Sequence, residues 1–457
     1  MVVNSSNPKR WLGALKNLVR GNNTRARKLA SRKASGAAAV APQSSVQNAA
    51  SRQAAASRQA AAPRQASSDS SQDSSLRQYM GWRSLINPLW CLYGMRVSVV
   101  ILSIFGLFMV FSSSSVTMIT YGAAPWGQGV NQTLYCILGT IGYIFASRLP
   151  ISYYRRYIAV IYTVSAVAQF LTFVPGLRRE VNGNAGWISI GPITLQPAEI
   201  TKLALCIWLP VALLAAKQAY KRVQMRAYIP AAAGLGLSLL LVIAGKDLGT
   251  ALIIIFIALI AFYLGGFPTR WLVGSIAVAV VLVALLVLTS QNRMRRILAT
   301  LHGCDAKAAR GVCFQAIHAQ YAMASGGLLG VGIGNSREKW NYLPYAHNDF
   351  IFAIIGEEMG FLVAAAVVLL YIVIGWCMMS SALQAESKFI SISLMCIATW
   401  IVGQGLVNIL VVVQLLPVMG VPMPFVSAGG SSLVMCLAAV GVADGLMREN
   451  PQLKVAK

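Results

Sequence analysis

Apolar stretches long enough to cross a lipid bilayer recur along this chain from about residue 93 to residue 447. A helix needs about 20 mainly apolar residues to span the hydrocarbon core, because each residue adds about 1.5 Å. We therefore predict an all-α polytopic membrane protein with ten transmembrane helices, in a membrane domain at 93–449. The approximate ranges of the ten helices are 94–113, 129–147, 157–174, 198–216, 227–245, 249–266, 272–290, 350–374, 389–413 and 430–447.

The composition agrees with this prediction and excludes two other classes of protein. Hydrophobic residues make up 57% of the 457 residues and charged residues only 11%. Soluble globular proteins have about 25% charged residues and about 45–50% apolar residues. The chain is therefore too apolar for a soluble fold of this size, and most of it is too apolar to be disordered.

The first 92 residues differ from the rest of the chain. They contain 14 of the 38 Lys and Arg residues, only two acidic residues, and a six-residue repeat, SRQAAA, at residues 51 and 57. No apolar run here approaches 18 residues, so we expect neither a signal peptide nor a membrane span. A nucleic-acid-binding arm would need aromatic residues between the central arginines, and the sequence has none there. We interpret 1–92 as a disordered basic cytoplasmic tail near anionic lipid headgroups, with no nucleic-acid partner.

The Lys and Arg residues of the short loops predict the orientation of the chain. Such residues concentrate in cytoplasmic loops. With the basic tail inside, both termini are cytoplasmic, and 450–457 is a short cytoplasmic tail. The large loop 291–349, between the seventh and eighth helices, is then extracytoplasmic. The inner loops contain Arg148, Arg155, Arg156, Lys217, Lys221, Arg222, Arg226, Arg270, Lys388 and Arg448.

Acidic residues cluster at the start of the eighth predicted helix. Asp349 lies at its outer mouth beside His347 and Asn348, and Glu357 and Glu358 follow about two turns later. A carboxylate within a bilayer is costly and is a functional candidate by default. Asp349 could act as a general base, or it could simply cap the helix, and local sequence leaves both interpretations open. Glu357 and Glu358 would each need a buried partner if their role is structural.

The segment before Asp349 is glycine-rich and then basic and aromatic, SGGLLGVGIGNSREKWNYLP. Glycines such as Gly326 and Gly327 let backbone approach a ligand and leave amides free for an anion. Arg337 and Lys339 add cationic groups of the kind that bind phosphate. Together with Asp349, this segment suggests chemistry on a lipid-linked phosphate or pyrophosphate at the membrane surface.

Two other acidic residues lie at the starts of predicted helices. Asp247, in the tight turn before the sixth helix, is expected to cap that helix and to pair with Lys246. Glu199 starts the fourth helix and is expected to pair with Lys202, three residues later. Both are therefore interpreted as helix-end charges from local sequence alone.

The cysteines fall into two groups. Six of the eight lie in predicted helices or within three residues of one, where they behave as small apolar residues. Cys304 and Cys313 both lie in the large outer loop, where an oxidising exterior favours a disulfide between them. Two unpaired thiols are the alternative. The spacing of Cys and His residues matches no metal site.

Two classes of function remain: an enzyme acting on a lipid-linked anionic substrate, and a transporter of such a substrate. A transporter would more often have charged residues in the middle of its spans and an internal repeat. Here the candidate groups concentrate at the outer face, and the two halves of the domain show no repeat. This favours chemistry at the surface.

Four segments of the chain resemble the SEDS family (shape, elongation, division, sporulation). They are NGNAGWISIGPITLQPAEITKLA, KDLGTALII, SGGLLGVGIGNSREKWNYLPYAHNDFIFAIIGEE and LLPVMGVPMPFVSAGGSS, in this order. The resemblance covers about 90–449, and AHNDFIFAIIGEE and PFVSAGGSS resemble the cell-division branch, of an actinobacterial type, rather than the elongation branch. It implies a peptidoglycan glycosyltransferase that polymerises lipid II during cell division and releases undecaprenyl pyrophosphate. A lipid II flippase and a non-catalytic divisome scaffold are the alternatives.

The resemblance also implies roles for individual residues. Asp349 matches the family's essential outer-loop aspartate and is expected to be the catalytic base. Asp247 matches the aspartate of the family's P-D-L-G-T segment, although Lys246 stands here in place of proline. The remaining expected substrate-binding residues are Lys339, Arg337, Lys246, Gly326, Gly327, His347, Ser427, Gly429, Gly430 and Ser431.

The family further implies partners and a location. The expected partners are lipid II and undecaprenyl-linked glycan, a class B penicillin-binding protein, the divisome proteins FtsQ, FtsL, FtsB and FtsZ, and membrane lipids. The expected location is the cell membrane at the division septum. A divalent cation, Mg²⁺ or Mn²⁺, could share in stabilising the pyrophosphate, but no ligand cluster in the sequence establishes one.

Overall fold

The computed structural model describes residues 81–181, 184–191, 193–289, 291–302, 311, 313–340, 342–451 and 453. The predicted tail up to residue 80, and Cys304, lie outside these residues. The helical body starts at Gly81, upstream of the predicted boundary at residue 93. The first long helix starts early because Asn87 caps it by accepting a hydrogen bond from the amide of Leu89, and Pro88 suits a first helical position.

A helix covers most of each of the ten predicted apolar stretches. Within the described residues, seven segments are long and apolar enough to cross a membrane: α4, the α7–α8 segment, α9, α10, α14, α15 and α16. The helices and short 3₁₀ turns of the described residues are η1 (Gly81–Ile86), α4 (Pro88–Thr120), α5 (Gly127–Arg148), α6 (Ile151–Leu171), α7 (Pro197–Val223), η2 (Gln224–Tyr228), α8 (Ile229–Ala244), α9 (Leu248–Gly265), α10 (Thr269–Leu288), α11 (Gln291–His302), α13 (Phe314–Gly326), α14 (Ile351–Gln384), α15 (Lys388–Val412) and α16 (Gly430–Met447).

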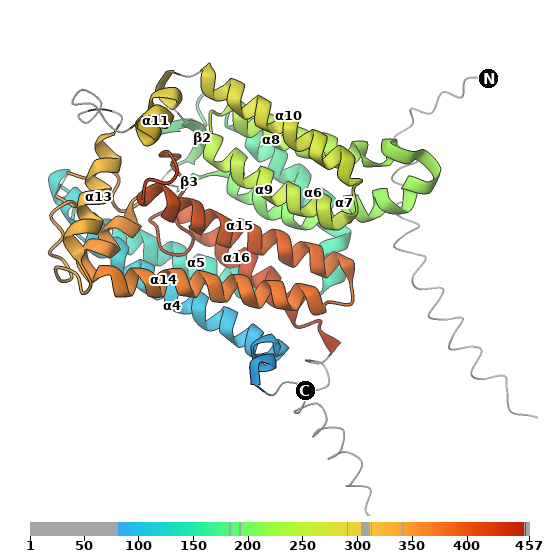
Figure 1. Cartoon of the computed structure of the whole chain (residues 1–457), viewed down its shortest axis with the longest axis horizontal. Helices are drawn as coiled ribbons and strands as arrows, with labels where there is room; N and C mark the ends of the chain where they lie inside the picture. Colours follow the sequence, from blue (N-terminus) through green and yellow to red (C-terminus); the bar gives the residue numbers. More distant parts are fainter. Residues whose placement is uncertain are drawn as a thin grey trace, which may run out of the picture. The chain divides into compact units, whose positions relative to one another are not determined.

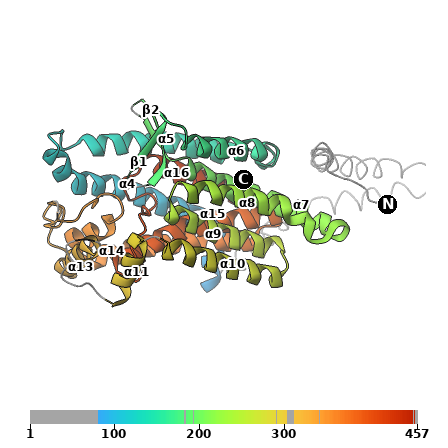
Figure 2. The ribbon, with the colours of Figure 1, turned by 90° about the horizontal axis from the view of Figure 1, so that it is seen from above.

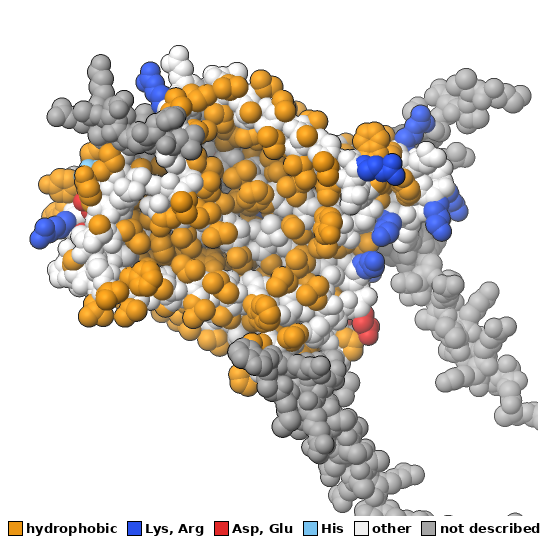
Figure 3. Space-filling model, viewed as in Figure 1, with side chains coloured by type: hydrophobic (Ala, Val, Ile, Leu, Met, Phe, Trp, Pro, Cys, Tyr) orange, Lys and Arg blue, Asp and Glu red, His pale blue; other side chains and the backbone are white. Residues whose placement is uncertain are grey.

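The long helices pack as a bundle. In it, α16 packs against α5, α14 packs against α4 and α15, and α7 contacts α6, α9 and α15. Figures 1 and 2 both place α10 at the edge of the bundle, and none of its residues is buried. Hydrophobic side chains cover the middle of the face shown in Figure 3, and Lys and Arg side chains lie at its two ends. This distribution is that of a multi-pass membrane protein.

The all-α prediction is wrong for the loop between α6 and α7. This loop forms an antiparallel sheet of three strands, β1 (Arg178–Val181), β2 (Asn184–Ile190) and β3 (Ile193–Leu195). Gly191 has a φ of 61°, which suits the tight turn between β2 and β3. The amide of Ala185 also donates a hydrogen bond to the carbonyl of Gly245 at 3.0 Å, so the sheet is fastened to the turn between α8 and α9.

Helix α14 is broken at Gly360, which has a φ of 77°. Two helical hydrogen bonds that would cross the break are replaced by bonds to the glycine-rich loop that follows α13. The amides of Phe361 and Leu362 donate to the carbonyls of Gly327 and Leu328. In return, the carbonyls of Glu357 and Glu358, freed by the break, accept from the amides of Val331 and Gly332, at 2.9 and 3.0 Å. Backbone groups at membrane depth must find protein partners, and the loop provides them.

The loop and the broken helix approach each other through glycines. A Cβ on Gly326 would overlap the carbonyl oxygen of Gly356, which is backbone and cannot move aside. Gly326 was predicted to contact substrate, but it is buried and serves to pack α13 against α14.

We predict that Gly326→Ala destabilises the protein. The overlap with Gly356 should lower the free energy of unfolding by about 1–3 kcal/mol, the usual cost of overpacking. Thermal unfolding in detergent measures the change. The matched control is Gly403→Ala on α15, where a Cβ meets no atom within 4 Å. Equal unfolding temperatures for the two variants would contradict this packing.

Candidate functional site

Asp349 lies in the turn immediately before α14 and does not cap it. The N-cap residue of this helix is Phe350, and no side chain makes a capping hydrogen bond there. Asp349 is half-buried, and no hydrogen bond or ion pair joins its carboxylate to another described residue. The helix-cap interpretation is therefore wrong, and the carboxylate is available for a ligand.

The backbone around Asp349 is held firmly although its side chain is not. Asn408, a buried residue of α15, donates from Nδ2 to the carbonyls of both Asp349 and Val421, each at 2.8 Å. The hydroxyl of Ser427 donates to the carbonyl of Asn348 at 2.6 Å. These bonds tie the turn before α14 to the 418–429 loop between α15 and α16.

The carboxylate of Asp349 lies in an unusual electrostatic environment. Burial raises its pKa, the nearby negative charge of Asp247 raises it further, and Arg296 partly opposes them, so that the pKa is about 6. Arg296, on α11, also donates to the carbonyl of Val418 at 3.1 Å. On the same loop, a Cβ on Gly420 would lie 3.6 Å from Oδ2 of Asp349. Asp349 is thus a stronger base than a free aspartate, yet mostly ionised at neutral pH.

Asp247 caps α9, as predicted. It accepts hydrogen bonds from the amide of Thr250 at 3.0 Å and from the Thr250 hydroxyl at 2.8 Å, while Gln196 Nε2 donates to it at 3.0 Å. The preceding residue, Lys246, has a φ of 65°, a conformation that proline cannot adopt. The turn therefore differs from that of a chain with proline at this position. The expected ion pair between Lys246 and Asp247 stays a prediction.

Arg337 and Lys339, the two basic residues of the segment 325–344, have different surroundings. The ammonium of Lys339 is buried and pairs with Glu358 at 2.8 Å, and Ser112 of α4 donates to the same carboxylate. Arg337 is exposed, and its amide donates to Glu357. The buried partners required of Glu357 and Glu358 are therefore present. Glu358 already neutralises the charge of Lys339, so this geometry does not support direct binding of phosphate by Lys339.

The amides of the glycine-rich loop are also occupied. The N–H groups of Gly330, Val331, Gly332 and Asn335 all donate to backbone carbonyls. The expectation that this loop offers free amides to an anion is therefore wrong at these four positions. Among the described basic side chains, Arg296 lies near Asp349, and Arg337 is exposed just after the glycine-rich loop.

Four residues just before or at the start of α16 were predicted to bind substrate. In the structure they mainly hold the 418–429 loop in place. Ser427 and Ser431 are buried, and Ser431 Oγ accepts from the amide of Gln196 at 3.4 Å. The amide of Gly429 donates to Gln132 of α5, and Gly430 packs on the ring of Tyr135.

His347 lies beside these residues and is half-buried. Its Nδ1 atom has no partner among the described residues. Burial lowers the pKa of its imidazole, so the ring is neutral at pH 7.

Two side-chain amides that position the site, those of Asn408 and Gln404, were not predicted from the sequence. Besides Asn408, Gln404 of α15 donates to the carbonyl of Pro422 at 2.8 Å and accepts from Lys202. Lys202 also forms the predicted pair with Glu199, at 2.8 Å, and both are buried. An available signal was the presence of amide side chains within apolar helices, which need partners there.

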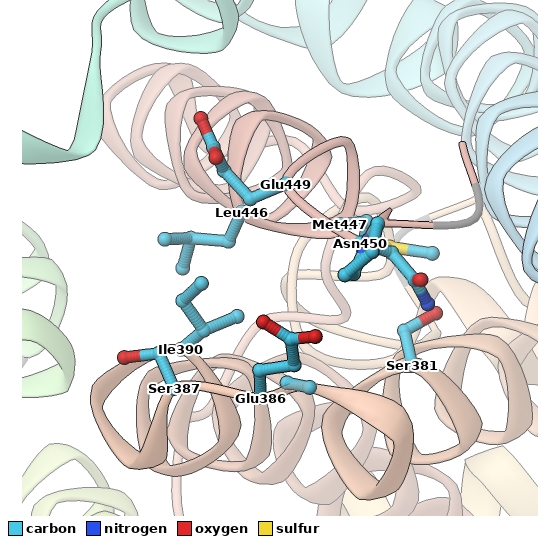
Figure 4. A pocket seen from close by; sticks show the side chains of 10 residues that line it. Ser381, Glu386, Ser387, Ile390, Leu446, Met447, Glu449 and Asn450 are labelled. Atoms are coloured by element: carbon cyan, nitrogen blue, oxygen red, sulfur yellow. The ribbon is translucent and has the colours of Figure 1, made fainter. Parts of the chain in front are cut away.

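A cavity of about 240 Å³ lies at the other end of α14, far from Asp349. It is bordered by the ends of α14 and α16 and the start of α15, and Leu446 and Ile390 face each other across it (Figure 4).

Cys313 is disulfide-bonded, and its expected partner Cys304 lies outside the described residues. Within the described part of the chain, no three His, Cys, Asp or Glu side chains cluster as a metal site would require.

The fold and this site define a multi-pass helical membrane protein with a half-buried carboxylate between α14 and the loop before α16. The chain matches the FtsW/RodA/SpoVE family of cell cycle proteins over residues 94–451, and it belongs to this family.

Relatives and solved structures agree with this assignment. A Mycobacterium tuberculosis protein named peptidoglycan glycosyltransferase FtsW is 33% identical over 356 residues, which are 78% of this chain and 67% of that one. A Trichlorobacter lovleyi protein of the same name is 32% identical, over 78% of this chain and 92% of that one. A chain of a peptidoglycan synthase complex has a TM-score of 0.62 at 23% identity and covers 79% of this chain and 98% of its own. Thermus thermophilus RodA has a TM-score of 0.56 at 24% identity, over 79% and 97%.

We predict that Asp349→Asn makes the protein more stable at alkaline pH. The raised pKa means that the folded state binds this proton more tightly than the unfolded state does. The ionised carboxylate therefore weakens the folded state above pH 6, and this penalty disappears as the pH falls towards 4. The unfolding temperature of the variant should exceed that of the native protein at pH 8, and the difference should shrink between pH 6 and pH 4.

Glu180→Gln is the control for this measurement, because Glu180 is an exposed carboxylate on β1. Its effect on the unfolding temperature should be small at every pH. A stabilisation by Asp349→Asn that stays constant from pH 8 to pH 4 would show that the pKa of Asp349 is not raised.

Proposed function

We propose that this protein is a peptidoglycan glycosyltransferase that polymerises lipid II into glycan strands during cell division. The observation that carries the proposal is the carboxylate of Asp349, which has a pKa of about 6 and no hydrogen-bond partner among the described residues. The name shared by the relatives supports it. The four sequence segments that resemble the SEDS family include this residue.

In the proposed reaction, Asp349 takes the proton from the 4-hydroxyl of a lipid II acceptor. The oxygen attacks the anomeric carbon of the growing lipid-linked strand, and the bond from that carbon to undecaprenyl pyrophosphate breaks. A base with a pKa near 6 is ionised at neutral pH and still accepts a proton readily. One carboxylate suffices because the leaving group is already an anion, unlike the alcohol that leaves in glycoside hydrolysis.

The charge that develops on the departing pyrophosphate needs cationic partners. Arg296 is placed for this role because it lies near Asp349 and is exposed on α11. Arg337 is exposed at the end of the glycine-rich loop and is the second candidate. A divalent cation, Mg²⁺ or Mn²⁺, would supply the same stabilisation if it entered with the substrate.

For this function we further propose ten membrane spans, α4 to α10 and α14 to α16, with both termini in the cytoplasm. Loop 291–349 would then lie outside, where lipid II presents its sugars. A basic tail at 1–92 and a short tail at 450–457 complete the proposed organisation. The proposed partner is a class B penicillin-binding protein, which would crosslink the strands, in keeping with the likeness to a chain of a peptidoglycan synthase complex. FtsQ, FtsL, FtsB and FtsZ would hold the protein at the septum.

We expect purified protein with its transpeptidase partner to form glycan strands from lipid II, and Asp349→Asn to slow this reaction at least about 100-fold. The reason is that general-base catalysis contributes about 10²- to 10⁴-fold. Gel analysis of the polymer measures the rate, and Glu180→Gln is the matched carboxylate control. A native rate for Asp349→Asn would exclude Asp349 as the base.

The same preparation separates the alternative functions. Movement of lipid II across vesicle membranes without polymer formation would support a flippase. Recruitment of the transpeptidase with neither activity would support a non-catalytic scaffold.

We predict different effects for substitutions of Lys339 and Arg337, the two basic residues of the segment 325–344. Lys339→Met should destabilise the protein by about 3–5 kcal/mol, because it leaves Glu358 as an unpaired buried charge. Arg337→Gln should leave the unfolding temperature unchanged and slow polymerisation about tenfold or more. The double variant Lys339→Met/Glu358→Gln should recover much of the stability. If instead Lys339→Met folded normally and only polymerisation failed, Lys339 would contact substrate after all.

A further inference from the structure

The tip of the glycine-rich loop exposes a group of large apolar side chains. Leu328 is 67% exposed, Leu329 is 79% exposed and Ile333 is 55% exposed. The segment from Ser325 to Ser336 contains no charged residue. Apolar side chains this exposed, on a loop whose backbone is firmly bonded, need an apolar surface to cover them.

The loop is fastened to a part of α14 that faces lipid. The amide of Leu362 donates to the carbonyl of Leu328 at 3.3 Å, and that of Phe361 donates to Gly327 at 2.9 Å. Phe361 and Leu362 are themselves more than half exposed, at 58% and 56%, on a long apolar helix. The apolar tip therefore continues the lipid-facing surface of α14.

Helix α4 provides a measure of depth. Near its inner end Arg96 pairs with Asp444 at 2.6 Å, and near its outer end Ser112 donates to Glu358, two residues before the break in α14. Ser112 follows Arg96 by sixteen positions, which is a rise of about 24 Å at 1.5 Å per residue. The hydrocarbon core is about 30 Å thick, so the break lies within its outer part if the charged pair marks the inner edge.

Aromatic residues follow the tip in the sequence. Trp340, Tyr342 and Tyr345 are 61%, 57% and 44% exposed. Trp and Tyr are enriched where membrane meets water, so the order of an apolar tip and then exposed aromatic residues is typical of a segment that leaves the outer leaflet.

We propose that the tip formed by Leu328, Leu329, Val331 and Ile333 is inserted in the outer leaflet of the bilayer and binds lipid acyl chains. The loop thereby fixes the outer end of α14 at the membrane surface, where Arg337 and Asp349 follow it in the chain. This proposal rests on the orientation proposed above for the membrane domain, but it does not depend on the proposed activity.

Spin labelling of the full-length protein in liposomes tests the proposal. A nitroxide is attached to the cysteine of a Leu329→Cys variant. The variant also carries Cys136→Ser, because Cys136 is only half-buried and could itself be labelled. The collision rates of the nitroxide with oxygen and with a water-soluble nickel chelate are then measured. Glu180→Cys, on exposed β1, is the aqueous reference, and Leu369→Cys, exposed on α14, is the lipid reference.

We expect the label at residue 329 to collide more with oxygen than with nickel, as at residue 369. Nickel accessibility equal to that at residue 180 would overturn the proposal. Protection from both reagents would also overturn it, because it would show that protein rather than lipid covers the tip. Leu328→Cys, at the same tip, gives a second test if Leu329→Cys does not fold.

Discussion

Asn408 donates two hydrogen bonds from within α15, one to the carbonyl of Asp349 and one to that of Val421. The bond to Val421 is buried in an apolar bundle and the bond to Asp349 is partly buried, so together they fix the two sides of the candidate site relative to each other. The carboxylate of Asp349 is left without a partner of its own in the described part of the chain. Rigid backbone and a free, partly desolvated side chain are the arrangement expected of a general base.

The same constraint shapes the outer loop. The break at Gly360 exposes amides and carbonyls of α14, and the loop at 327–332 pairs with them. The side chains of Glu357 and Glu358, at the break, then bind Ser336, the amide of Arg337, Lys339 and Ser112. Loops are usually more mobile than the helices they connect, but the backbone of this loop is paired with a broken helix. The position of Arg337 therefore depends on the backbone pairing of α14.

Much of this could be predicted from the sequence, because membrane helices follow directly from hydrophobicity. The apolar runs gave the positions of the long helices, and Asp349, Asp247 and the Glu199–Lys202 pair were identified from single residues in context. The roles of Asn408 and Lys339 could not be predicted, because each depends on a partner distant in the chain: Val421 and Asp349 for Asn408, Glu358 for Lys339. The β-sheet at 178–195 was missed because its strands are only three to seven residues long.

The central claim is that Asp349 accepts the proton of the attacking sugar hydroxyl. The most direct test is a structure of the Asp349→Asn protein with lipid II bound, since this variant keeps the shape of the site and should trap the substrate. We predict that the 4-hydroxyl of the acceptor lies within about 3 Å of the side chain of residue 349, the distance of a hydrogen bond. A bound acceptor whose 4-hydroxyl contacts another residue, with residue 349 beyond reach even through one water, would contradict the account.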